Sequence, residues 1–138
     1  MRRYIMYIRF VSPRWLDRRR GNCGIFQAAL DVVYDSSTPE HFYLPLRELL
    51  DWFNDHLPAP DDNRFAVRSR KRNIEVGICW FRADARDMLR NAHLMAAILR
   101  DYGVAIAHIT TRDPGQLLYS DRYQVVAKPA VHTPTIWH

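Results

Sequence analysis

A strand–helix–strand pattern between residues 74 and 109 restricts the fold of this chain more than any other feature. From residue 74 to residue 80 apolar side chains recur at every second position, and the other parity also carries the apolar residues Cys79 and Phe81. A strand that is apolar on both sides is typical of a position inside a sheet. We therefore expect residues 74–82 to form a central strand that is covered on both faces.

The segment that follows has the three- and four-residue spacing of an amphipathic helix. Asp84 is a suitable N-cap and Gly103 a suitable left-handed terminator, which predicts a helix over residues 84–102. Its apolar positions are Ala85, Met88, Leu89, Ala92, Ala96 and Leu99. A short apolar strand is predicted directly afterwards, over residues 104–109. Such units normally close as right-handed parallel crossovers, so the two strands should run parallel in one sheet.

The other elements complete an α+β pattern. Helices are predicted over residues 25–33, 46–57 and 84–102, and strands over residues 4–11, 65–67, 74–82, 104–109, 117–119 and 123–127. Ser12-Pro13 is expected to end the first strand and residues 15–24 to form a loop. Pro39 suits the first position of a helix, but Pro45 is expected to break or restart it before the helix of residues 46–57. The expected fold is a two-layer sandwich with a mixed sheet and about three helices, in the order β-α-α-β-β-α-β-β-β.

Length and composition are those of one packed domain: 138 residues, of which 48% are hydrophobic and 25% charged. Residues 1–128 are expected to form that domain, and residues 129–138 an extended C-terminal arm. No apolar run approaches the roughly 18 residues of a membrane helix, which favours a cytoplasmic location. Cys23 and Cys79 lie far apart in apolar sequence, which predicts two buried thiols and no paired zinc or CxxC redox site.

The net charge of +5 would suit an acidic partner, although 18 of the 20 basic residues are arginine, a skew that genome composition alone can produce. One cluster comprises Arg14, Arg18, Arg19 and Arg20, and a second comprises Arg64, Arg68, Arg70, Lys71 and Arg72. The second cluster lies on a predicted hairpin, where arginines could contact phosphates while Phe65, Trp80 or Tyr102, if exposed, stack on bases. A soluble hairpin tip explains the same residues, so nucleic-acid binding stays an alternative.

The carboxyl ends of strands 74–82 and 104–109 define a candidate ligand crevice, because open sheets of parallel strands bind ligands there. The residues expected at this edge are Arg82, Asp84, His108, Thr110, Thr111, Arg112 and Asp113. Together with the helix N-terminus they would suit an anionic ligand and could support acid–base chemistry. A structural interpretation is stronger, with Asp84 as a helix cap and Asp113-Pro114-Gly115 as a turn.

No fingerprint of a known enzyme chemistry is present, since the chain has no GxGxxG, P-loop, HExxH or GxSxG motif. Cys79 is a poor candidate nucleophile, with His93 or His108 as its base, because a cysteine in a two-sided apolar strand is inaccessible. No second histidine or carboxylate is in register with His93, so no metal site is expected. An enzymatic activity is therefore left uncertain, binding is favoured over catalysis, and no cofactor is expected.

Three of the four tryptophans favour an interaction surface. Trp15, Trp52 and Trp137 fall in the predicted loop, on the polar-flanked side of the second helix, and in the tail. A core of this size cannot hold all of them, and exposed tryptophans are typical of interfaces. The best interpretation is a small binding module that self-associates as a homodimer or binds a protein partner, with Ile136-Trp137 in the contact arm. The alternatives are the nucleic-acid-binding hairpin and a small enzyme or anion-binding protein.

Overall fold

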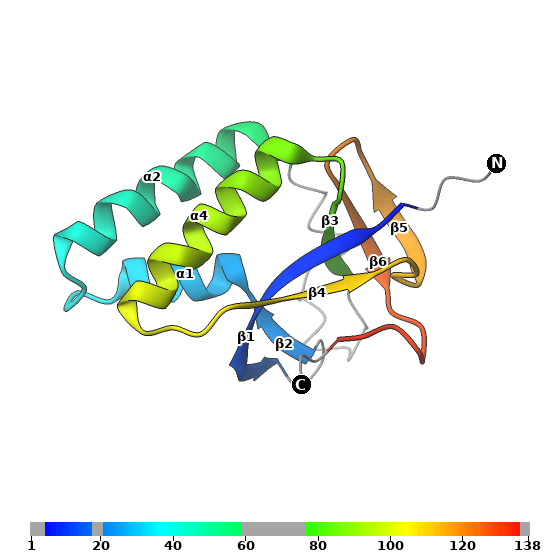
Figure 1. Cartoon of the computed structure of the whole chain (residues 1–138), viewed down its shortest axis with the longest axis horizontal. Coiled ribbons are helices and arrows are strands. Elements are labelled where there is room, and N and C mark those ends of the chain that lie inside the picture. The colour runs from blue at the N-terminus through cyan, green and yellow to red at the C-terminus, as the bar shows by residue number, and fades with distance from the viewer. Residues whose placement is uncertain (1–4, 18–20, 59–76, 136–138) are drawn as a thin grey trace, which may run out of the picture.

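The computed structural model describes residues 5–17, 21–58 and 77–135, and all structural statements below refer to these residues. They form three helices and six strands (Figure 1). The helices are α1 (Ile25–Tyr34), α2 (Glu40–His56) and α4 (Arg86–Tyr102). The strands are β1 (Tyr7–Asp17), β2 (Gly21–Gly24), β3 (Ile78–Arg82), β4 (Ala107–Thr111), β5 (Gln116–Ser120) and β6 (Gln124–Lys128).

Strand β1 organises the sheet. Its residue Tyr7 pairs with Arg82 of β3 and with Thr111 of β4, so β1 lies between these two strands. Strand β6 pairs with β3, β5 pairs with β6, and β2 pairs with the second half of β1. All these pairings are antiparallel, which corrects the expected mixed sheet. Strands β3 and β4 do run parallel to each other, as predicted, but β1 separates them.

The α+β class and the three predicted helices are confirmed. Helix α4 ends as expected, because Gly103 adopts the left-handed conformation with φ 109°. Strand β2 lies within the segment that the sequence predicted as a loop, residues 15–24. The strand predicted over residues 65–67 lies outside the described residues.

Strand β1 continues past Pro13, which corrects the expected end at Ser12-Pro13. Its register against β2 shifts between Ser12 and Leu16, so Pro13 falls in an irregular part of the ladder. Proline is tolerated at such irregularities because no ladder hydrogen bond is required of it there. Pairing with a second strand therefore overrides the local stop signal.

Helix α2 begins before Pro45, which corrects the expected start at residue 46. Pro39 is its N-cap and Pro45 lies inside it. A proline in the second turn forfeits one helical hydrogen bond, here to the carbonyl of His41, an exposed residue near the helix start. Burial of Leu46 and Phe53 further along the helix stabilises it in spite of that loss.

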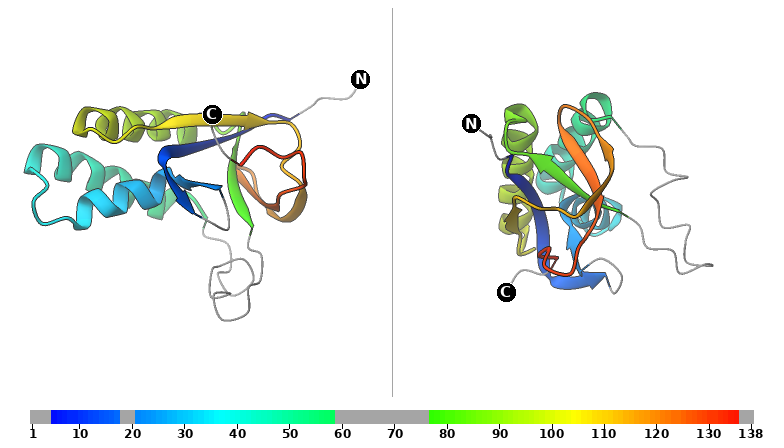
Figure 2. Two further views of the ribbon diagram at one scale, coloured as in Figure 1. Left: turned by 90° about the horizontal axis from the view of Figure 1, so that it is seen from below. Right: turned by 90° about the vertical axis from the view of Figure 1, so that its right-hand side faces the viewer.

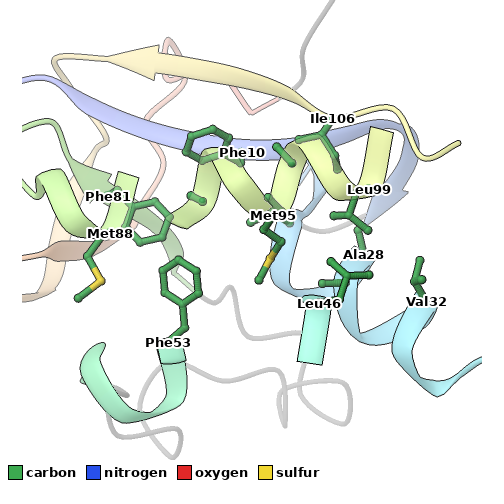
Figure 3. Close-up of a cluster of buried hydrophobic side chains, with 14 of the residues drawn as sticks. Phe10, Ala28, Val32, Leu46, Phe53, Phe81, Met88, Met95, Leu99 and Ile106 are labelled. Carbon is green, nitrogen blue, oxygen red and sulfur yellow. The ribbon is translucent and has the colours of Figure 1, made fainter. Parts of the chain in front are cut away.

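Two apolar clusters lie on opposite faces of the sheet. On one face all three helices pack against Phe10 of β1 and Phe81 of β3 (Figure 3). The cluster on the other face consists of strand residues only: Tyr7, Val11, Ile78, Trp80, Ile109 and Val125. Strand β3 contributes to both clusters, which confirms that it is a central strand. On the helix side its cover includes Phe81 but not Cys79. Strand β5 is the last strand of the sheet and lies at the end away from α1 (Figure 2).

Residues 129–135, expected to belong to an extended arm, fold back on the turn between β4 and β5. The amide of Thr133 donates to the carbonyl of Ala130, which closes a turn at a distance of 3.0 Å. Thr133 is only 7% exposed, and its hydroxyl donates to the carbonyl of Asp113 at 3.2 Å. This contact explains why a polar residue near the C-terminus is buried.

Candidate functional site

The ends of β3 and β4 lie at one edge of the sheet, as predicted for the crevice. Arg82 at the end of β3 and Thr111 at the end of β4 pair with the same residue, Tyr7, from opposite sides. Two strand spacings of about 4.8 Å each place these two backbones roughly 10 Å apart. The geometric premise of the crevice is therefore met: both strands leave the sheet at one edge.

A cavity of about 530 Å³ opens at this edge, but only beside β3. Its charged lining residues are Arg82, Asp84, Arg86, Asp87 and Arg122. Arg82 and Asp84 are therefore the two predicted residues that line it. His108, Thr110 and Thr111 of β4 do not, nor do Arg112 and Asp113 after it. Arg122 was missed, although its turn directly precedes β6, the neighbour of β3. No local sequence signal could have placed it here, because its position depends on the pairing of β6 with β3.

Asp84 does not cap helix α4, which corrects the sequence prediction. The N-cap is Ala85, which makes no side-chain cap hydrogen bond. Asp84 instead accepts two hydrogen bonds from Arg82, from Nε at 3.1 Å and from Nη2 at 3.3 Å. The guanidinium lowers the pKa of the Asp84 carboxyl, and the carboxylate raises the pKa of Arg82. The two charges offset each other, so the crevice offers an anion less than its arginines suggest.

Asp113 and Thr111 build the turn between β4 and β5. The Thr111 hydroxyl accepts from the Asp113 amide and donates to the Asp113 carbonyl, both at 3.1 Å. The Asp113 carboxylate accepts from the amide of Gly115 at 3.1 Å and contacts Nε2 of His132 at 2.6 Å. These contacts agree with the structural interpretation of Asp113-Pro114-Gly115.

The contact with His132 predicts a pH effect. It is the largest cause that lowers the pKa of the Asp113 carboxyl. A carboxyl whose folded pKa lies below its unfolded value, about 3.9 for Asp, stabilises the fold above that value. The contribution is lost as the pH falls through the folded pKa. In an NMR titration, His132→Asn should raise the Asp113 midpoint towards the ordinary value; an unchanged midpoint would show that the contact is absent in solution.

The predicted site residues on β4 lie away from this cavity, beside helix α4. His108 and Thr110 are exposed on β4, and His93 is exposed on α4. The buried Phe10 ring lies beside both imidazoles, with centroid distances of 4.9 Å to His93 and 6.2 Å to His108. The imidazoles are 6.4 Å apart, so a second histidine does lie near His93. In the described part of the chain, no three metal-binding side chains lie close enough together to hold an ion.

Cys79 is exposed, which corrects its expected burial within β3. Its neighbours Ile78 and Trp80 are only 2% and 1% exposed. They point to the opposite face of the sheet, so their burial does not cover the thiol. Burial of Trp80 also removes one of the three residues considered for base stacking. Tyr102 is half-buried, and its hydroxyl lies 3.4 Å from Oγ1 of Thr38. The basic cluster at residues 64–72 lies outside the described residues.

Trp52 is half-buried, which removes it from the exposed tryptophans that favoured an interface. Its ring stacks on His56 at 4.5 Å and packs edge-on against Phe53 at 5.1 Å. The side chains of Trp15 and Trp137 lie outside the description. An interaction surface in the described residues therefore depends on a feature other than an exposed tryptophan.

Strand β4 supplies such a feature. Three strands border the described part of the sheet, namely β2, β4 and β5. The ladders of β2 and β5 each carry a register shift, between Ser12 and Leu16 and between Leu117 and Tyr119. Strand β4 pairs with β1 over five consecutive residues without such a shift, and its sequence holds no Pro, Lys or other charge. Proteins normally protect an edge strand from pairing with another chain by a bulge, a proline or a charged side chain, and β4 has none of these.

Comparisons with protein-family models, with curated proteins and with solved structures found no match for this chain. No helix in the described ranges is long and apolar enough to span a membrane.

Proposed function

We propose that this protein is a protein-binding module that takes an extended, acidic segment of a partner along the outer edge of β4. The observation that carries the proposal is the regular, uncharged ladder of β4, which pairs with no described strand other than β1. An extended peptide that adds to such an edge gains main-chain hydrogen bonds, and side chains beside the edge select its sequence.

Helix α4 provides the side chains beside that edge. Its residue His93 packs on Phe10 of β1, opposite His108 of β4. The guanidinium of Arg100 donates two hydrogen bonds to the carbonyl of Ile106, at 3.0 and 2.9 Å, and so ties this face of α4 to the start of β4. This face of the helix therefore borders whatever lies along β4.

The face that contains His93 is basic. Arg86 and Arg90 precede His93 by seven and three residues, a spacing that places them on the same helical face, and both are exposed. Asp87 follows Arg86 and therefore lies to one side of this face. Its carboxylate is 3.8 Å from Nη1 of Arg90, which is long for an ion pair. Arg112 follows β4 and is also exposed. Complementary charge thus favours an acidic peptide, in keeping with the net charge of +5.

A charge placed on the β4 edge tests the proposal. The probe is a labelled heptapeptide of alternating valine and glutamate, compared with one of alternating valine and lysine by fluorescence anisotropy. We expect the acidic peptide to bind and the basic one not to bind. Thr110→Glu, at an exposed position of β4, should weaken acidic-peptide binding about tenfold because it adds a like charge beside the edge. Thr110→Lys should not weaken it.

Ser120→Glu on β5 is the matched control, since Ser120 is exposed on the opposite border of the sheet. Equal losses for the two glutamate variants, or no binding of the acidic peptide at millimolar concentration, would refute the β4 edge as its site. Light scattering distinguishes the other occupant. A mass near 16.3 kDa is expected, whereas twice that mass, lowered by Thr110→Glu, would show that β4 pairs with a second copy instead.

A further inference from the structure

A cavity opens beside β1, at the point where its pairing with β3 ends and its pairing with β2 begins. Strand β1 pairs with β3 only through Tyr7 and Ile8, and with β2 from Val11 onward. Arg9 and Phe10 lie between these two ladders. A cavity of about 290 Å³ fills the resulting notch, on the side of β1 away from β4.

The walls of the cavity are mainly apolar. Phe26 and Leu30 of α1, Leu57 after α2, and Phe81 of β3 contribute to them. The Phe26 ring lies 6.1 Å from that of Phe81, so an aromatic surface runs along one wall. A cavity of about 150 Å³ lined by such side chains holds benzene. The present volume therefore has room for a molecule of about two fused rings.

Arg9 sets the charge of the cavity. It lines the wall and is half-buried, and its Nη1 is shielded from solvent. A guanidinium carries five N–H donors, so it can serve more than one acceptor at a time. A carboxylate in the cavity can therefore share this guanidinium with its other contacts and form a charge-assisted hydrogen bond with it.

We propose that this cavity binds a small aromatic carboxylate, with the rings against Phe26 and Phe81 and the carboxylate directed to Arg9. The occupant follows from the two properties of the walls, an apolar volume for about two rings and one half-buried cation. The site is separate from the β4 edge, because the two lie on opposite sides of β1. Either site can therefore fail its test without the other.

Gly24 offers a way to close the cavity. It lines the cavity, and its backbone is extended, with φ −73° and ψ 162°, a conformation that any residue adopts. A Cβ at this position would lie 3.7 Å from Nη2 of Arg9, which is an ordinary contact. Gly24→Leu should thus direct its side chain into the cavity without strain. Gly24→Ala restricts the backbone in the same way but leaves most of the cavity volume open.

The probe is 2-naphthoate, with the neutral 2-naphthalenemethanol for comparison, measured by isothermal titration calorimetry. We expect naphthoate to bind about tenfold more tightly than the alcohol, because only the acid pairs with Arg9. Gly24→Ala should change its affinity less than about threefold, and Gly24→Leu should lower it at least about tenfold. Arg9→Met should remove the preference for the acid over the alcohol. Naphthoate should also slow alkylation of Cys79, which lines the cavity, as followed by peptide mass spectrometry.

Each contrary result overturns the proposal. Absence of binding at millimolar concentration excludes the ligand class. Equal affinity in Gly24→Ala and Gly24→Leu, with no protection of Cys79, shows that naphthoate binds elsewhere. Equal affinity for acid and alcohol in the unaltered protein excludes the role of Arg9. The Gly24 pair keeps the test decisive even when Arg9→Met does not fold, because it leaves the charge in place.

Discussion

Replacing Phe10 by alanine should lower the free energy of unfolding by about 3–5 kcal/mol, the usual cost of truncating a fully buried phenylalanine. Phe10 is 1% exposed, and its ring lies beside Phe81 of β3, His93 of α4 and His108 of β4. Its ring is 6.3 Å from Phe81 and 4.9 Å from His93, so three elements lose contact when the ring is removed. Urea unfolding followed by circular dichroism measures the change.

Leu94→Ala is the control for this prediction. Leu94 lies on the same helix as His93 but is 50% exposed, so its truncation should cost less than about 1 kcal/mol. Phe10→Leu should give an intermediate loss, because leucine refills part of the volume. A loss below about 1 kcal/mol for Phe10→Ala would show that the cluster under α4 does not pack as described.

Gly115→Ala should destabilise the protein by about 2–4 kcal/mol, through backbone strain and a steric clash acting together. Gly115 has φ 103°, in the left-handed region that side chains rarely adopt. A Cβ there would meet the carbonyl oxygen of Lys128 and the amide of Ala130, both backbone atoms that cannot rotate away. The turn between β4 and β5 would have to separate from the end of β6.

Gly103→Ala is the matched variant, because Gly103 has φ 109° and a Cβ there would meet nothing within 4 Å. It carries the conformational cost alone, about 1–2 kcal/mol. The difference between the two variants therefore measures the close approach of the backbones at Gly115. Equal losses would contradict that approach. Thermal unfolding of both variants gives the comparison.

Local sequence predicted the elements whose signals are periodic and self-contained. Helix α4 has one continuous apolar stripe and a glycine terminator, and neither depends on the rest of the chain. The alternation in β3 likewise predicted a central strand, because a strand that is apolar on both sides can be buried only inside a sheet. The common edge of β3 and β4, and with it the positions of Arg82 and Asp84, could be predicted because a strand–helix–strand unit normally closes as a parallel crossover.

The errors lie where two local signals compete or where a distant segment decides. Asp84 could cap the helix or pair with Arg82, and the geometry of the strand end favours the pair. Pro13 is a local stop, yet β1 runs on because β2, formed by a later segment, pairs with it across an irregular ladder. Periodicity cannot show that Cys79 is exposed, because exposure depends on what packs above the strand.

The sequence by itself thus determined the class of the fold, its three helices and the direction of β3 relative to β4, since short-range patterns of burial and capping specify these. The tertiary structure alone decided that β1 lies between β3 and β4, that β4 borders the sheet, and that a cavity opens at Arg9. Each of these depends on which strands pair at long range, and pairing energy comes from contacts between residues far apart in the chain. The edge and the cavity are therefore properties of the assembled sheet, which no single segment encodes.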